Sequence, residues 1–110
     1  MLDRANWNLI PDHMHGAVRR YFEQGIPPGH FLTAVLSNDL RGACERADDE
    51  NRHRLYEYIK FFYLYAPAGS WGSPEAFERW IADTTEAAEK IAEEEAAEER
   101  AANGQFGVGA

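Results

Sequence analysis

The chain has 110 residues, which suits one small domain with a single core. Its 45% apolar and 13% aromatic residues exclude a fully disordered chain, and no stretch reaches the roughly 20 uncharged apolar residues of a membrane span. The first residues show no basic segment followed by an apolar run, so we expect no signal peptide. The lone Cys44 excludes an intramolecular disulfide and a cysteine-based zinc site, and it suits a reducing cytoplasm.

The negative charge is concentrated in the last third of the chain. The formal net charge is −8, from 11 Lys and Arg against 19 Asp and Glu. Residues 74–110 hold ten acids and three bases, whereas residues 1–73 hold nine acids and eight bases. A nucleic-acid-binding surface needs a basic surplus, because phosphate neutralisation supplies most of its affinity. We therefore expect no direct binding of DNA.

The first two predicted helices are separated by a proline- and glycine-rich turn. Residues 1–10 show no period and predict an irregular lead-in. A helix is predicted over 11–24, because Pro11 fits a first turn and Gly25 fits the position after the last turn. A second helix, from about 28 to 47, is predicted by an apolar stripe at helical spacing. The stripe consists of Phe31, Leu32, Val35, Leu36, Leu40 and Ala43.

The third predicted helix covers 49–65 and is the most aromatic segment. Asp48 fits its N-cap position, and this capping explains the acidic run 48–51 better than a calcium loop, whose alternating ligands and glycine are missing. After Tyr58 the apolar side chains point nearly all round, which places this helix centrally in the core or in an interface. A strand over 58–65 is the alternative.

The last predicted helix follows a loop over 66–72. Ser73 as N-cap and Pro74 in the first turn are a strong helix start. Its apolar stripe is Phe77, Trp80, Ile81, Thr84, Ala88 and Ile91. The sequence thus predicts an all-α, four-helix domain with a single core over 11–85. An acidic, solvent-exposed helix over 86–102 and a disordered tail over 103–110 complete the prediction.

Motifs of catalysis and of metal binding are missing from the sequence. We find no nucleophile elbow, phosphate loop, paired carboxylates or Cys–His motif, so we expect neither an enzyme nor a cofactor. On a helix, His13 and His15 point in directions about 200° apart, and neither His30 nor His53 has a partner one turn away. A metal site needs three or four convergent ligands, so none is expected.

Two polar residues, Asn38 and Asp39, interrupt the stripe of the second helix. At this spacing Asp39 shares a face with Val35, so its carboxylate must lie at an exposed edge or be paired. Arg41 and other nearby arginines are available partners. One interpretation is a clamp between this helix and a neighbouring loop, and the other is a polar pocket that orients a ligand. Gly42 indicates a kink or a close helix contact.

Three further residues are candidate contacts. Arg19 and Arg20 form the densest cationic spot, which is either a solvated face or a contact for a phosphate or an acidic partner. Trp71 lies in a glycine-flanked loop, where it either caps the core or anchors a partner. The candidate ligand or partner residues are therefore Arg19, Arg20, Asn38, Asp39, Arg41 and Trp71.

Several short motifs resemble a family of short proteins encoded by tailed bacteriophages and prophages, and the match covers about residues 9–82. They are Ile26-Pro27-Pro28-Gly29, Phe31-Leu32, Ala34-Val35-Leu36, Asn38-Asp39-Leu40, Ala47-Asp48, Asn51 and Trp71-Gly72-Ser73-Pro74-Glu75 with Trp80. The family has no settled activity, so no catalytic residue carries over. The resemblance implies a protein made in the cytoplasm of an infected bacterium, where such proteins often modulate host machinery or host defence.

The sequence leaves three functional hypotheses open. The first is a non-catalytic binding protein that acts on a host or defence component, either a protein or a small nucleotide signal, and self-associates through the helix 49–65. The second is a virion-associated or structural accessory protein that uses the acidic helix as an arm. The third is mimicry of nucleic acid by carboxylates at helical spacing, namely Glu86, Glu89, Glu93 and Glu94. A membrane role is not expected, because interfacial helices carry Lys and Arg.

Overall fold

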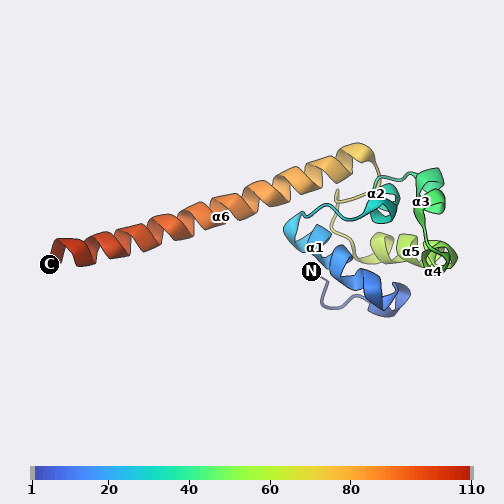
Figure 1. Cartoon of the computed structure of the whole chain (residues 1–110), viewed down its shortest axis with the longest axis horizontal. Coiled ribbons are helices and arrows are strands. Elements are labelled where there is room, and N and C mark those ends of the chain that lie inside the picture. The colour runs from blue at the N-terminus through green and yellow to red at the C-terminus, as the bar shows by residue number, and fades with distance from the viewer. Residues whose placement is uncertain (1, 110) are drawn as a thin grey trace.

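The chain folds into helices joined by short loops, as a computed structural model describes for the backbone of residues 2–109 and the side chains of residues 2–101. Within this part there is no β-strand, which confirms the predicted all-α class. Figure 1 shows a body from which one long helix projects. The elements are two 3₁₀ turns, η1 (Trp7–Leu9) and η2 (Asp12–Met14), and the helices α1 (His15–Gln24), α2 (His30–Leu36), α3 (Leu40–Arg46), α4 (Asp49–His53), α5 (Leu55–Tyr65) and α6 (Pro74–Gly109).

The core is built mainly from aromatic rings on α1, α2 and α5. Phe22 of α1 packs edge-on against Phe62 of α5, with ring centroids 5.6 Å apart. Phe31 of α2 meets Tyr58 of α5 at 5.1 Å in the same geometry, which aromatic pairs prefer. The inner side of α5 is thus the centre of the core, as its pattern predicted, and the alternative of a strand over 58–65 is wrong.

The lead-in contributes to this core although its sequence shows no period. Leu2 and Ile10 are buried, and the Trp7 ring lies 4.9 Å from the Phe61 ring. The His15 Nε2 atom lies 2.8 Å from the Trp7 carbonyl oxygen and 2.7 Å from the Ile10 carbonyl oxygen. Its N–H donates to these two carbonyls. These contacts hold η1 against α1 and α5, so the packed body extends beyond the predicted boundary at residue 11.

The predicted helix over 28–47 is two helices rather than one. The chain turns between α2 and α3 because Asn38 adopts a left-handed conformation with φ of 62°, which Asn tolerates better than most residues. The Asp39 carboxylate then caps α3 by accepting a hydrogen bond from the Gly42 N–H at 3.0 Å. As a result Leu40, which we had placed on the buried stripe, is 68% exposed.

The predicted helix over 49–65 is also divided, at Arg54, into α4 and α5. The predicted cap is confirmed, since Asp48 accepts a hydrogen bond from the Asn51 N–H at 2.7 Å. The side chain of Asn51 is buried and accepts a hydrogen bond from the Tyr58 hydroxyl at 2.6 Å. This bond fixes α4 against α5 across the break.

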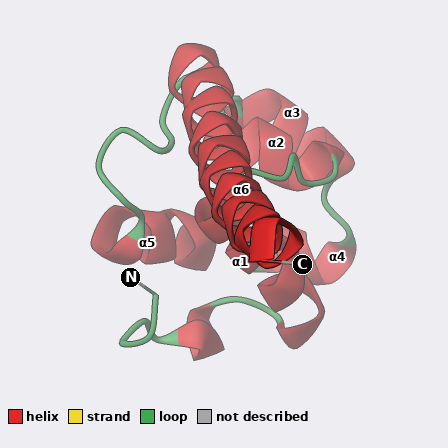
Figure 2. Cartoon of the chain, turned by 90° about the vertical axis from the view of Figure 1, so that its left-hand side faces the viewer, coloured by secondary structure: helices red, strands yellow, loops and turns green. Residues whose placement is uncertain are grey.

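Helix α6 begins on the body and then leaves it. Ser73 caps it as predicted, with its hydroxyl 3.0 Å from the Ala76 N–H, and the Trp80 indole N–H donates to the Tyr21 carbonyl at 2.9 Å. Beyond Thr84 the side chains through residue 101 are almost all exposed. Figure 2, which looks along α6 from its free end, shows the shorter helices gathered behind it.

The projecting part of α6 contains the predicted acidic helix over 86–102. Its helical backbone continues to Gly109, past residue 102 where we expected the helix to end. The predicted tail over 103–110 therefore has a described helical backbone as far as Gly109, whereas its side chains and Ala110 lie outside the described residues. Because of this arm, the molecule measures 65 × 27 × 23 Å along its principal axes.

Candidate functional site

The six predicted contact residues lie in three separate places. Arg19 and Arg20 are on α1, and Trp71 is in the loop before α6. The turn between α2 and α3 and the start of α3 carry Asn38, Asp39 and Arg41. Only Asn38 and Asp39 line a common hollow with each other. The structure therefore does not gather the six residues into one site.

Arg19 and Trp71 are engaged within the chain. The Arg19 guanidinium carbon lies 4.4 Å from the centre of the Trp7 ring, and its Nη1 lies 3.3 Å from Glu23 Oε1. The half-buried Trp71 ring lies 5.6 Å from Phe62, and the N–H of Gly72, the next residue, donates to a carbonyl at the end of α2. These contacts support the interpretation of Trp71 as a cap on the core. Arg20 is exposed.

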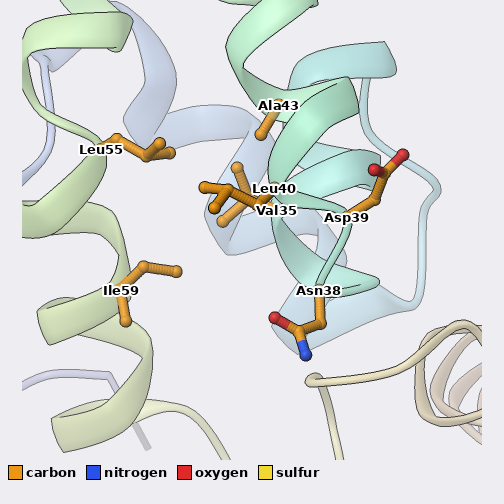
Figure 3. Close-up of a pocket in the computed structure, with 7 residues that line it drawn as sticks. All are labelled: Val35, Asn38, Asp39, Leu40, Ala43, Leu55 and Ile59. Atoms are coloured by element: carbon orange, nitrogen blue, oxygen red, sulfur yellow. The ribbon is translucent and has the colours of Figure 1, made fainter.

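Asp39 is an exposed helix cap rather than a clamp with arginine. Its carboxylate points away from α5 (Figure 3) and accepts the N–H of Gly42. Two neighbouring arginines have other partners: Arg41 pairs with Glu45 at 3.0 Å, and Arg52 pairs with Asp49 at 3.2 Å. Arg46 lines a hollow together with Asp39 but forms no ion pair with it. The expectation that Asp39 shares a helix face with Val35 was wrong, because the left-handed turn rotates α3 relative to α2.

A groove between α3 and α5 is the main apolar hollow near these residues. Figure 3 shows Leu55 and Ile59 of α5 facing Val35, Leu40 and Ala43, with Asn38 at one end. We call the seven residues that line it the α3–α5 groove: Val35, Asn38, Asp39, Leu40, Ala43, Leu55 and Ile59. Its volume of about 30 Å³ is far below the roughly 300–1,000 Å³ of small-molecule pockets. In one chain the groove therefore has room for the tip of a side chain and not for a nucleotide.

Two larger hollows have charged side chains in their walls. One, of about 220 Å³, lies between α2 and α3 and is lined by His30, Thr33, Ala34, Ser37, Asp39 and Arg46. The other, of about 370 Å³, lies between η2 and the start of α4 and is lined by Asn8, Ile10, Pro11, Asp12, His13, Glu50 and Arg54. Both combine acidic and basic side chains, so neither presents the uniform positive charge that would attract a phosphate.

The described part of the chain holds no cluster of metal-ligating side chains. No three His, Cys, Asp or Glu side chains converge there as metal ligands. His13 lies 3.7 Å from Asp48 and 3.9 Å from Glu50, but all three side chains are more than half exposed.

Burial raises the pKa of two tyrosines well above the ordinary value. The Tyr21 hydroxyl donates to the Ser70 carbonyl at 2.6 Å, and burial alone raises its pKa. Burial is also the largest cause of the raised pKa of Tyr58, and the carboxylates of Asp48 and Glu50 add to it. Both hydroxyls stay protonated at neutral pH, so these two tyrosines act as hydrogen-bond donors that hold the core together.

The surface that stands out most is the outward side of α5, within the segment 49–65 that the sequence predicted to lie in the core or in an interface. Tyr56 and Tyr63 are 72% and 80% exposed, and Leu64 is exposed beside them. We call Tyr56, Lys60, Tyr63 and Leu64 the α5 outer face. The signal was present in the sequence, since residues seven apart on a helix share a face. The sequence did not separate this side from the buried one, because aromatic residues also fill the inner side of the same helix.

Comparison with known proteins gives no relative to guide the assignment. No protein family, no curated protein and no solved structure matches this chain. Among the described residues, no helix has both the length and the apolar character that crossing a membrane requires.

Proposed function

We propose that this chain is a phage-encoded, non-catalytic binding protein that modulates a component of the host cell or of its defence. The observation that carries this proposal is the exposed apolar surface formed by the α3–α5 groove and the α5 outer face. Leu40, Tyr56 and Tyr63 all project into water there. Exposed apolar patches of this kind, rimmed by polar residues, are typical of interaction sites. The resemblance to phage proteins supplies the cellular context, the cytoplasm of an infected bacterium.

The size of the groove favours a protein partner over a small nucleotide signal. A hollow of about 30 Å³ admits a methyl group or a ring edge from a partner helix or loop. None of its lining residues is a cation, and Arg41, next to the lining residue Leu40, is paired with Glu45. A nucleotide would therefore need further walls and further positive charge from a second chain, so the nucleotide version of this proposal depends on self-association.

The test is a defence assay in bacteria that express the chain together with an anti-phage system. Wild-type protein is expected to restore plaque formation by a sensitive phage, and Leu40→Asp to abolish that effect. Ile91→Asp is the matched control, because Ile91 is 54% exposed on the projecting part of α6 and the substitution makes the same charge change. Restoration by Leu40→Asp at the wild-type level, with unchanged circular dichroism, would refute the use of this surface.

A second candidate function rests on the arm formed by α6. Its free part is long, acidic and exposed, which supports an accessory protein of the virion that uses α6 as an arm, or a mimic of nucleic acid. Deletion of residues 92–110 separates both from the first proposal. Loss of the effect in the deletion variant supports the arm. A deletion variant as active as wild type removes the arm from consideration and leaves the α3–α5 surface.

A further inference from the structure

We infer that a second copy of this chain covers the α5 outer face, by antiparallel pairing of α5 with its counterpart around a two-fold axis near Ile59 and Lys60. The inference deepens the self-association expected for residues 49–65 by assigning it one face, one direction and one axis, and the protein-binding version of the proposed function does not require it. The pairing leaves Leu40 and the far side of the groove open to another partner.

The outer face has the spacing of a helix-pairing seam. Tyr56, Lys60 and Tyr63 follow one another at intervals of four and three residues, which places them on one side of the helix. The opposite side, with Tyr58 and Phe62, is fully buried in the chain's own core. Helix α5 therefore has two apolar sides, and only one of them is used within the monomer.

Antiparallel pairing brings both tyrosines into the contact at once. With the axis between residues 59 and 60, Tyr56 of one copy lies opposite Tyr63 of the second copy, and the same contact repeats on the other side of the axis. At a rise of about 1.5 Å per residue the two contacts are about 10 Å apart. A two-fold axis makes such a surface complementary to itself, which is why two-fold dimers are the commonest oligomers.

Charge complementarity selects the antiparallel arrangement. In this register Lys60 lies about 3 Å along the helix axis from the position of Glu57 in the second copy, close enough for an ion pair. Parallel pairing would instead set Lys60 against Lys60 and Glu57 against Glu57, and like charges in contact oppose association. The acidic part of α6 does not interfere, since it projects away from α3, α4 and α5 (Figure 1).

The exposed area suits a small and weak interface. A tyrosine presents roughly 200 Å², so Tyr56 and Tyr63 at 72% and 80% exposure leave about 300 Å² per copy and about 600 Å² for both copies. Burial of Leu64 and Ile59 as well brings the total towards the roughly 1,000 Å² that distinguishes specific interfaces from chance contacts.

The test is the mass of the full-length chain in solution, measured by light scattering after size exclusion at micromolar concentration. We expect twice the chain mass, or an even multiple of it, for wild type, and a smaller species for Tyr63→Asp. Lys60→Glu and Glu57→Lys should each weaken association at least tenfold, and the double variant should restore it. Ile91→Asp should associate like wild type.

Three results would overturn the inference: a wild-type monomer at 100 μM, association unchanged in Tyr63→Asp, or a charge-swap double variant no stronger than its parents. The defence assay keeps this failure distinct from failure of the proposed function. If Tyr63→Asp is monomeric and still restores plaque formation while Leu40→Asp does not, the binding function stands without the dimer. Circular dichroism of each variant checks that the helices are intact.

Discussion

Raising the pH above about 10 should destabilise the fold through two buried tyrosines, Tyr21 and Tyr58. Both side chains are fully buried, and their hydroxyls donate hydrogen bonds at 2.6 Å, to the Ser70 carbonyl and to Asn51 respectively. Burial raises the pKa of each above the ordinary value near 10. In the unfolded chain both hydroxyls ionise near pH 10, whereas in the folded chain they stay protonated to higher pH.

The sign and size of the effect follow from proton linkage. The unfolded state binds fewer protons than the folded state above pH 10, so the free energy of unfolding falls as the pH rises. The stabilising contribution is complete below about pH 10 and is lost as the pH climbs towards the raised folded pKa values. Above pH 10, each tyrosine lowers the free energy of unfolding by about 1.4 kcal/mol per pH unit. Together they should remove about 2–3 kcal/mol by pH 11, a large share of the ~5–15 kcal/mol typical of a domain.

The assay is urea unfolding followed by circular dichroism between pH 9 and pH 11.5. Tyr58→Phe and Tyr21→Phe should each flatten the pH dependence by about half, whereas Tyr56→Phe, whose hydroxyl is exposed, should keep the wild-type slope. Comparison between variants cancels the titration of every group that they share. A wild-type stability that stays level across this range, or a Tyr58→Phe slope equal to that of wild type, would refute the reasoning.

Three substitutions test the local geometry by the free energy of unfolding in urea. Gly42→Ala should stabilise α3 by about 1 kcal/mol through helix propensity, but only in an Asp39→Ala background. In the wild-type background the added methyl group would collide with the capping carboxylate of Asp39. Additive effects of the two substitutions in a double-variant cycle would contradict this. Gly25→Ala should cost about 2–4 kcal/mol, since φ is +68° and its new Cβ would lie 2.8 Å from the Thr84 Cβ, and a neutral result would contradict that contact. Asn51→Leu should cost about 1–3 kcal/mol by removing the acceptor of a buried hydroxyl, and a smaller cost would show that the bond contributes little.

The parts of the fold that the sequence predicted are those fixed by local chemistry. Asp48 and Ser73 cap their helices as expected, because the capping bond involves residues only three positions apart. The end of α1 at Gly25 was predictable for the same reason, since a left-handed residue after the last turn favours glycine.

The break between α2 and α3 was not predictable from the same signals. The apolar stripe runs through Asn38 without a change of phase, and Ala43 beyond it is buried as expected. A left-handed residue in the middle of a regular stripe depends on how the two flanking helices pack, which is a property of the tertiary structure. Leu40 was placed on the wrong side because Asn38, with its positive φ, ends α2 and starts a new helix with a different orientation.

The candidate contacts show a similar limit. The sequence left two alternatives open for Arg19, a solvated face or a partner contact, and two for Trp71, a cap on the core or a partner anchor. In the structure Arg19 stacks on Trp7 and Trp71 packs against Phe62. Each of these contacts joins segments far apart in the sequence or an irregular lead-in that has no period to read. The residue types therefore indicated which contacts these side chains can make. Whether the side chains are free to contact a partner depends on the tertiary packing.

The division of α5 into an inner and an outer side connects the fold to the proposed function. A body this small has a core that the inner side, with Phe61 and Phe62, already fills. Tyrosine at 56 and 63 suits the outer side, because a ring with a polar tip tolerates water when it is free and still buries a large area when it is covered. Ile59 borders both the groove and the outer face. A partner seated in the groove and a second copy on the outer face would therefore share one side chain, and reciprocal linkage would couple their affinities.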